Sequence, residues 1–139
     1  MAFNRIEEMD EDDFLMGLRG NPKELKIIKV GELRESENDD GGEYFYVTFE
    51  NPKTCQTFDM GYNVKRMDDG DLYIGSKSKL YPLLSYVSGI NDGGIQCEYS
   101  DIVSGLDGLS FKATARREKF GNKKYFIILP IADDGGAAF

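Results

Sequence analysis

The sequence contains no histidine and only two cysteines, Cys55 and Cys97, among its 139 residues. Histidine is the side chain that most often transfers protons near neutral pH, so its absence disfavours most familiar enzyme designs. Two cysteines without histidine cannot complete a Cys/His zinc site. We therefore expect no enzymatic activity, no catalytic residue, no metal site and no cofactor. In a reducing compartment two thiols are more often small buried side chains than a disulfide, so no disulfide is expected.

Long apolar runs are also missing. No stretch approaches the roughly 18 continuous apolar residues that cross a bilayer. The first residues, MAFNRIEEMDEDD, lack the basic and then apolar layout of a secretory signal. We therefore expect a cytoplasmic protein without a membrane partner. A length of 139 residues with 40% apolar content predicts a single domain with a core of its own.

Two acidic runs, residues 37–42 and 68–71, combine Asp with Gly and predict solvated turns. Calcium binding is the competing interpretation of the first run. Aligned with an EF-hand loop, this run places Ser36 at position one and Val47 at position twelve, where calcium requires carboxylates. The turn interpretation is therefore favoured.

Residues 70–78 come close to a phosphate-binding loop, in which a lysine directly follows the second glycine. Here Ser76 separates Gly75 from Lys77, so the lysine is displaced from the place where it reaches the phosphates. A short strand followed by the start of a helix explains the same residues, 70–78. A nucleotide hydrolase is therefore not expected.

Alternating apolar residues predict three strands in the first half of the chain. The first covers residues 23–34 and bends near Gly31; one face carries Leu25 and Ile27, and the other carries Lys26, Ile28 and Val30. The second, residues 43–50, is the clearest strand. Its two faces are Phe45, Val47 and Phe49 on one side and Tyr44, Tyr46 and Thr48 on the other. The third, residues 57–64, turns one apolar face to the core: Phe58, Met60, Tyr62 and Val64.

The second half begins with a predicted helix over residues 76–88, which Ser76 or Ser78 caps and Gly89 ends. A connector rich in glycine and aspartate follows over residues 90–110, with one helical turn near residues 101–103. The last two strands form a hairpin that turns at Gly121 and Asn122.

The last hairpin is strongly basic inside an acidic protein. Residues 112–124 hold one acid and six basic residues, whereas the whole chain has a net charge of −8. The basic residues are Lys112, Arg116, Arg117, Lys119, Lys123 and Lys124. Such segregation of charge favours an anionic partner. The competing interpretation is that lysines on an exposed hairpin keep sheets of neighbouring molecules apart.

A two-residue turn at Gly121 and Asn122 also fixes which residues of the hairpin face each other. It pairs Phe120 with Lys123 and Lys119 with Lys124, and further on Arg117 with Phe126 and Arg116 with Ile127. Two lysines side by side repel each other. The repulsion is relieved if phosphates approach this end of the hairpin, which makes it a second argument for an anionic ligand.

The order strand, strand, strand, helix, strand, strand over residues 24–131 resembles the OB fold. The expected architecture is thus mainly β (α+β), a five-stranded OB-like barrel with one helix between strands 3 and 4. Residues 1–22 are expected to form an acidic N-terminal arm, residues 23–132 the OB-like domain and residues 133–139 an acidic flexible tail. The arm either lies over the basic surface when ligand is absent or is a solvated flank.

The resemblance implies a single-stranded nucleic-acid-binding protein, most readily a DNA-binding protein of replication, repair or recombination. OB domains stack bases on aromatic rings and hold phosphates with Lys and Arg. Tyr44, Tyr46 and Tyr125 are the candidate stacking residues, and the six basic hairpin residues are the candidate phosphate contacts. Lys65 and Arg66 would extend this track. For the tyrosines, ordinary amphipathic packing is the competing interpretation.

The C-terminal residues Asp133, Asp134 and Phe139 are similar to the acidic, aromatic-ended tails of bacterial and phage single-strand DNA-binding proteins. That resemblance implies docking of replication or repair proteins; a tail without such a role is the alternative. The rival function is a non-enzymatic protein-interaction or structural module of viral or plasmid type. The acidic net charge of −8 favours this rival, because an acidic surface repels nucleic acid outside the basic hairpin.

Overall fold

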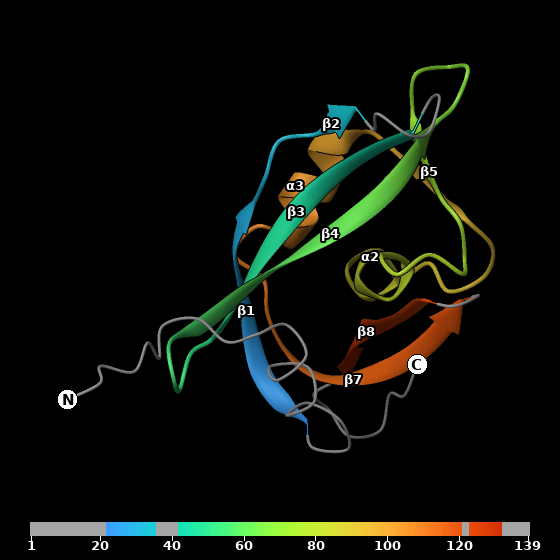
Figure 1. Cartoon of the computed structure of the whole chain (residues 1–139). Coiled ribbons are helices and arrows are strands. Elements are labelled where there is room, and N and C mark those ends of the chain that lie inside the picture. The colour runs from blue at the N-terminus through green and yellow to red at the C-terminus, as the bar shows by residue number, and fades with distance from the viewer. Residues whose placement is uncertain (1–21, 36–41, 121–122, 132–139) are drawn as a thin grey trace.

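The computed structural model describes residues 22–35, 42–120 and 123–131, and the side chains of these residues outside 118–125. This part of the chain forms eight strands and two helices, so the protein is mainly β as predicted (Figure 1). The strands are β1 (Lys23–Val30), β2 (Arg34–Glu35), β3 (Gly42–Asn51), β4 (Gln56–Arg66), β5 (Leu72–Ile74), β6 (Ile95–Cys97), β7 (Ser110–Phe120) and β8 (Lys123–Ile131). The helices are α2 (Tyr81–Ser88) and α3 (Tyr99–Leu106).

All strands belong to one antiparallel sheet with the order β6-β5-β4-β3-β1-β7-β8, and β2 pairs with β3. The predicted count of five strands is wrong. Five long strands lie where the sequence placed them, but β2, β5 and β6 add two or three residues each. β2 and β5 pair with the ends of longer strands, β6 pairs with β5, and all three are too short to show an alternating pattern.

The strands β1, β3, β4 and β7 form a Greek key, because they lie in the spatial order β7-β1-β3-β4. β8 extends this arrangement by pairing with β7. Within the described residues, no ladder joins the two ends of the sheet, β6 and β8, so the sheet stays open. The structure therefore shows an open sheet where the sequence predicted a barrel.

The ladder between β3 and β4 builds the centre of the core. It runs without interruption from the pair Gly42–Lys65 to the pair Asn51–Gln56. The predicted apolar faces of both strands are buried: Phe45, Val47 and Phe49 on β3, and Phe58, Met60, Tyr62 and Val64 on β4. The ring of Phe49 stacks on Phe58 with centroids 5.5 Å apart and meets the edge of Phe111 from β7 at 6.4 Å. Phe49 thus connects the β3–β4 pair with the hairpin strands.

A β-bulge bends β1. Ile27 pairs with Phe49, but the next pair joins Lys29 to Thr48, so Ile28 is the additional residue. The shift turns Lys29 outward beside Thr48 and turns Val30 inward beside Val47. The predicted bend is therefore present, but the prediction that Val30 shares a face with Ile28 is wrong. Strict alternation cannot anticipate a bulged residue.

The helix α2 begins at Tyr81, later than the predicted start at Ser76, and ends before Gly89, which adopts φ 77° as its C-cap. Pro82 lies in the first turn, where a missing N–H group leaves no bond unmade. Before the helix, the amide of Ser78 donates to the carbonyl oxygen of Gly75 at 3.0 Å, which forms a turn. The Ser78 hydroxyl accepts from the amide of Leu80 at 3.2 Å, but Ser78 lies two residues before the N-cap position, which Leu80 occupies, so it does not cap α2.

A second helix, α3, lies where the sequence predicted one helical turn. The prediction of a single helix is therefore wrong. A capping box starts α3: Glu98 and Asp101 each accept from the other's backbone amide. The hydroxyl of Tyr99 donates to the carbonyl oxygen of Gly31, which ties α3 to the end of β1. Burial, and then the nearby Glu32 carboxylate, raise the pKa of the Tyr99 hydroxyl. Among the described helices, none is both long and apolar enough to span a membrane.

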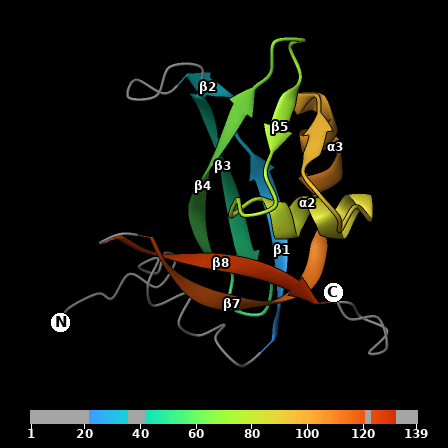
Figure 2. The same ribbon diagram turned by 90° about the vertical axis from the view of Figure 1, so that its right-hand side faces the viewer.

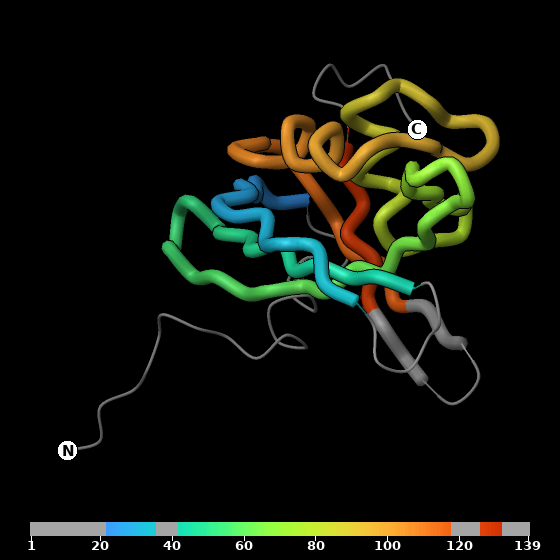
Figure 3. Tube along the Cα trace, turned by 90° about the horizontal axis from the view of Figure 1, so that it is seen from above, coloured from blue at the N-terminus to red at the C-terminus, as the bar shows by residue number. Residues whose placement is uncertain are grey.

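The β7–β8 hairpin has the predicted register, with Phe120 beside Lys123, Lys119 beside Lys124, Arg117 beside Phe126 and Arg116 beside Ile127. Figure 2 shows β7 and β8 running crosswise below β3 and β4. Seen from above in Figure 3, the segment of residues 88–108 lies on one side of the molecule and β3 and β4 on the opposite side. The outer face of β3 and β4 therefore looks away from the helices.

Both cysteines are free thiols, and their surroundings predict different reactivities. The expected burial is wrong for Cys55, which is exposed in the turn between β3 and β4, whereas Cys97 is half-buried at the end of β6. Burial raises the pKa of the Cys97 thiol, and the carboxylates of Asp101 and Asp71 raise it further. A raised pKa lowers the thiolate fraction at neutral pH, so Cys97 should be the less reactive thiol.

We expect Ellman's reagent to react with the protein in two phases, the fast one at Cys55 and the slow one at Cys97. The variant Cys55→Ser should lose the fast phase. Loss of the slow phase in this variant would contradict the structure.

Candidate nucleic-acid interface

Two tyrosines lie on the outer face of β3. The side chain of Tyr46 is 48% exposed and Tyr44 is half-buried. Their rings meet edge to face, with centroids 5.8 Å apart and planes at 87°. The ring of Tyr46 lies over Gly61 of β4, because a Cβ atom at that position would come within 3.2 Å of the ring. Glycine opposite the tyrosine thus leaves room for the ring to lie against the neighbouring strand.

The sheet register places basic and amide side chains beside these rings, because directly opposed residues of antiparallel strands share a face. Arg34 of β2 and Asn63 of β4 flank Tyr44 on its two sides. One step further along β4, Lys65 pairs with Tyr73 of β5, whose side chain is 43% exposed. We call this surface the tyrosine face; its residues are Lys29, Arg34, Tyr44, Tyr46, Asn63, Lys65 and Tyr73.

Acidic residues bound the tyrosine face at both ends. At one end, Asp59 accepts a hydrogen bond of 2.5 Å from the Thr48 hydroxyl. At the other end, the side-chain amide of Gln96 donates to Asp69 at 3.0 Å and to Asp71 at 2.9 Å. An anionic ligand would be repelled at these two borders. The aromatic and basic stretch between them is therefore the part of the face that suits an anion.

The structure places Lys65 and Arg66 differently, although the sequence predicted both as ligand contacts. Lys65 is exposed on the tyrosine face. Arg66 forms an ion pair with Glu43, with its Nε and Nη2 donating to the carboxylate at 2.7 and 3.0 Å, and its Nη1 donates to the carbonyl oxygen of Gly70 at 2.6 Å. The hydrogen bonds to Glu43 raise the pKa of Arg66. The guanidinium group of Arg66 thus serves contacts within the protein.

The hairpin carries its described basic side chains on two faces. Lys112, Arg116 and Arg117 are all exposed. Neighbouring residues of a strand point to opposite faces, so Arg116 and Arg117 do not act on the same side. The guanidinium of Arg117 lies 5.0 Å from the ring centroid of Phe126, which is a cation–π contact. For four further residues predicted to contact the ligand, the structure describes the backbone, and the side chains lie outside the described part: Lys119, Lys123, Lys124 and Tyr125.

The sheet separates the hairpin from the tyrosine face. β7 reaches β3 through β1, to which it pairs at Lys23–Lys26. Tyr44 lies near the opposite end of β3, where the neighbouring strand is β2. The basic hairpin and the tyrosines that the sequence suggested are therefore two patches of the surface, and the sheet pairing does not make them neighbours.

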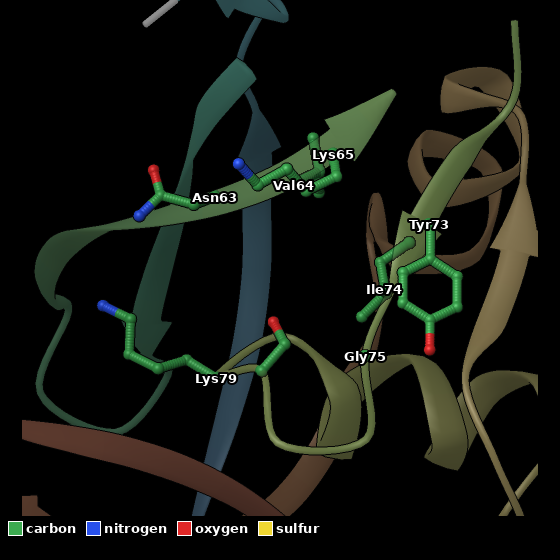
Figure 4. A pocket seen from close by; sticks show the side chains of 8 residues that line it. Asn63, Val64, Lys65, Tyr73, Ile74, Gly75 and Lys79 are labelled. Carbon is green, nitrogen blue, oxygen red and sulfur yellow. The ribbon is translucent and has the colours of Figure 1, made fainter. Parts of the chain in front are cut away.

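A pocket of about 350 Å³ adjoins the tyrosine face at the edge of β4 (Figure 4). Asn63 and Lys65 border it on β4, and Tyr73 borders it on β5. The turn before α2 contributes Ser78 and Lys79. The ammonium nitrogen of Lys79 lies 5.8 Å from the ring centroid of Tyr62. Tyr73 and Lys79 were not among the predicted site residues, because β5 has three residues and no alternating pattern of its own.

The predicted arm and tail, including Asp133, Asp134 and Phe139, lie outside the described residues. Within the part of the chain that is described, no group of three or more Cys, Asp or Glu residues is placed to hold a metal ion. Comparisons with family models, with curated proteins and with solved structures find no match for this chain. The fold and the surface of the chain itself therefore support the function proposed below.

Proposed function

We propose that this protein binds single-stranded nucleic acid, DNA in the first place, through an OB-like domain and without enzymatic activity. The strand topology supports this proposal. An OB domain is a five-stranded, partly open Greek-key barrel, and the five long strands here combine a Greek key with one further hairpin strand. The helix α2 lies between the third and fourth of these strands, as expected for the class.

The tyrosine face is the observation that carries the proposal. OB domains bind oligonucleotides on the face of their second and third strands, which correspond to β3 and β4. Here that face presents Tyr46 and Tyr44 for stacking, and Lys65 beside them for a phosphate. Every base offers a flat π-face, so such stacking tolerates any sequence. We therefore propose binding without strong sequence preference.

The charge distribution supports the same ligand. The net charge of −8 opposes binding of nucleic acid over most of the surface. The basic residues of the tyrosine face and the exposed Arg116 and Arg117 of the hairpin are local exceptions. A single strand of nucleic acid attracted by these basic residues would bind at defined places on the protein, and its affinity would depend on salt.

The test measures fluorescence anisotropy of labelled single-stranded DNA, single-stranded RNA and duplex DNA over a matched series of salt concentrations. We expect the single strands to bind and the logarithm of the affinity to fall linearly with the logarithm of salt. Arg116→Ala and Arg117→Ala, tested separately, reveal which hairpin face contacts phosphate, because each lost contact lowers the slope by about 0.7. Lys53→Ala, at an exposed position in the β3–β4 turn, is the control and should keep the wild-type slope.

No binding of any single strand at low salt would overturn the proposal. If the protein then also forms a defined oligomer or retains a protein partner, the alternative of an interaction or structural module takes its place. Equal slopes for wild type, Arg116→Ala and Arg117→Ala, together with clear binding, would remove the hairpin from the interface and leave the tyrosine face as the binding surface.

A further inference from the structure

Among the described residues, no strand lies beside most of one edge of β4. β3 covers the other edge from Gln56 to Lys65. In the described part of the chain, a second strand, β5, pairs with β4 at Lys65 and Arg66. Alongside the remaining edge lie the turn of residues 75–80 and the start of α2 (Figures 1 and 4). The pocket beside the tyrosine face opens between this turn and β4.

The lining of this pocket has the chemistry of an anion site. Lys65 and Lys79 come from opposite sides, Asn63 adds an amide, and Ser78 adds a hydroxyl group. The described lining contains no acidic residue. Lys79 is half-buried against the ring of Tyr62, so its charge is less exposed to screening by salt than a surface lysine. Two ammonium groups at one small opening favour a phosphate over a neutral ligand.

The ring of Tyr73 forms the β5 side of the pocket. A Cβ atom at Gly94 would collide with the ring, and a Cβ atom at Gly75 would lie at an ordinary contact distance of 3.6 Å from it. The glycine at position 94 thus leaves the room that the ring of Tyr73 occupies. Because Tyr73 pairs with Lys65 in the sheet, its ring and the Lys65 ammonium group belong to the same outer face.

We propose that this pocket is a phosphate subsite of the single strand, an inference that rests on the proposed function. The single strand of nucleic acid passes from Tyr46 and Tyr44 over Asn63 to the edge of β4. There one backbone phosphate lies between Lys65 and Lys79, and the adjoining base lies against Tyr73. The pocket volume of about 350 Å³ is within the range of small-ligand sites.

The turn beside the pocket differs from a loop that wraps the phosphates of a free nucleotide. In such a loop the backbone amides point to the ligand, whereas the amide of Ser78 donates to the carbonyl oxygen of Gly75 within the turn. Of the two lysines in this turn, Lys79 lines the pocket, and Lys77, the nearer match to the loop motif, is exposed outside the lining. A backbone phosphate contacted by side chains suits this geometry better than a triphosphate held by the backbone.

The difference between Lys79 and Lys77 provides the test. Lys79→Gln removes the charge in the pocket but keeps most of the apolar stem of the side chain, and Lys77→Gln makes the same change two residues away on the same turn. We expect Lys79→Gln to lower the salt slope for labelled single-stranded DNA by about 0.7 and Lys77→Gln to leave it unchanged. Circular dichroism and thermal unfolding of both variants check that they fold like the wild type.

If wild type binds the strand and both variants keep its slope, the pocket proposal is overturned while the proposed function stands. If wild type binds no single strand, the proposed function fails first. In that case thymidine monophosphate is titrated while backbone amide shifts are followed by NMR. Saturating shifts at Tyr73, Ser78 and Lys79 would keep the pocket as a phosphate site for a free nucleotide, and their absence would overturn it.

Discussion

Replacing Tyr46 with alanine should weaken the binding of single-stranded DNA by about 5- to 150-fold, the effect of losing one stacked base worth about 1–3 kcal/mol. The side chain is 48% exposed, and its ring lies over Gly61. Few core contacts are lost with it, so the effect should fall on affinity and not on folding. The measurement is a titration of labelled oligonucleotide at fixed low salt.

Tyr46→Phe is the matched control, since it keeps the ring and removes the hydroxyl. It should bind within about twofold of wild type if stacking is the source of affinity. Equal affinity of wild type and Tyr46→Ala would exclude this tyrosine from the interface. Tyr44→Ala should have a smaller effect than Tyr46→Ala, because the half-buried Tyr44 offers less of its ring to a base.

Replacing Phe49 with alanine should lower the free energy of unfolding by about 3–5 kcal/mol, the usual cost of removing a buried phenylalanine ring. Phe49 is fully buried and contacts rings on both sides, Phe58 of β4 and Phe111 of β7. A domain of this size is stable by about 5–15 kcal/mol, so the loss is a large part of the total. Urea denaturation followed by circular dichroism measures it.

Ile28→Ala is the control for this prediction. Ile28 is also a large apolar residue of the sheet, but its side chain is 43% exposed at the bulge of β1. Its replacement should change the free energy of unfolding by about 0.5 kcal/mol or less. Similar losses for Phe49→Ala and Ile28→Ala would show that the core does not centre on the β3–β4 pair.

Local patterns predicted the parts of this fold that local sequence determines. Period-two alternation identified the buried faces of β3 and β4, because each strand has one face in the core and one outside. The short turn at Gly121 and Asn122 fixed the register of the last hairpin, which the structure confirms from Phe120–Lys123 to Arg116–Ile127. In both cases a pattern within a short stretch of the chain was enough for the prediction.

Pairings between segments that are far apart along the chain could not be predicted from the sequence. Arg66 meets Glu43, which is 23 residues away, because both lie at the same end of the β3–β4 ladder. Tyr73 stands beside Lys65 through the register of β5, a strand of three residues with no pattern of its own. The separation of the hairpin from the tyrosines likewise follows from the order of strands in the sheet, which periodicity does not contain.

The bulge in β1 places two consecutive exposed residues, Ile28 and Lys29, between the inward-facing Ile27 and Val30, and deletion of either would restore regular alternation. Leu25, Ile27 and Val30 would still face the core in both cases. Deletion of Lys26 or Ile27 would instead bring Ile28 to the inner side of the strand. β1 can therefore lose one residue at the bulge. A related chain shortened in this way could keep the same inner and outer surfaces of the sheet.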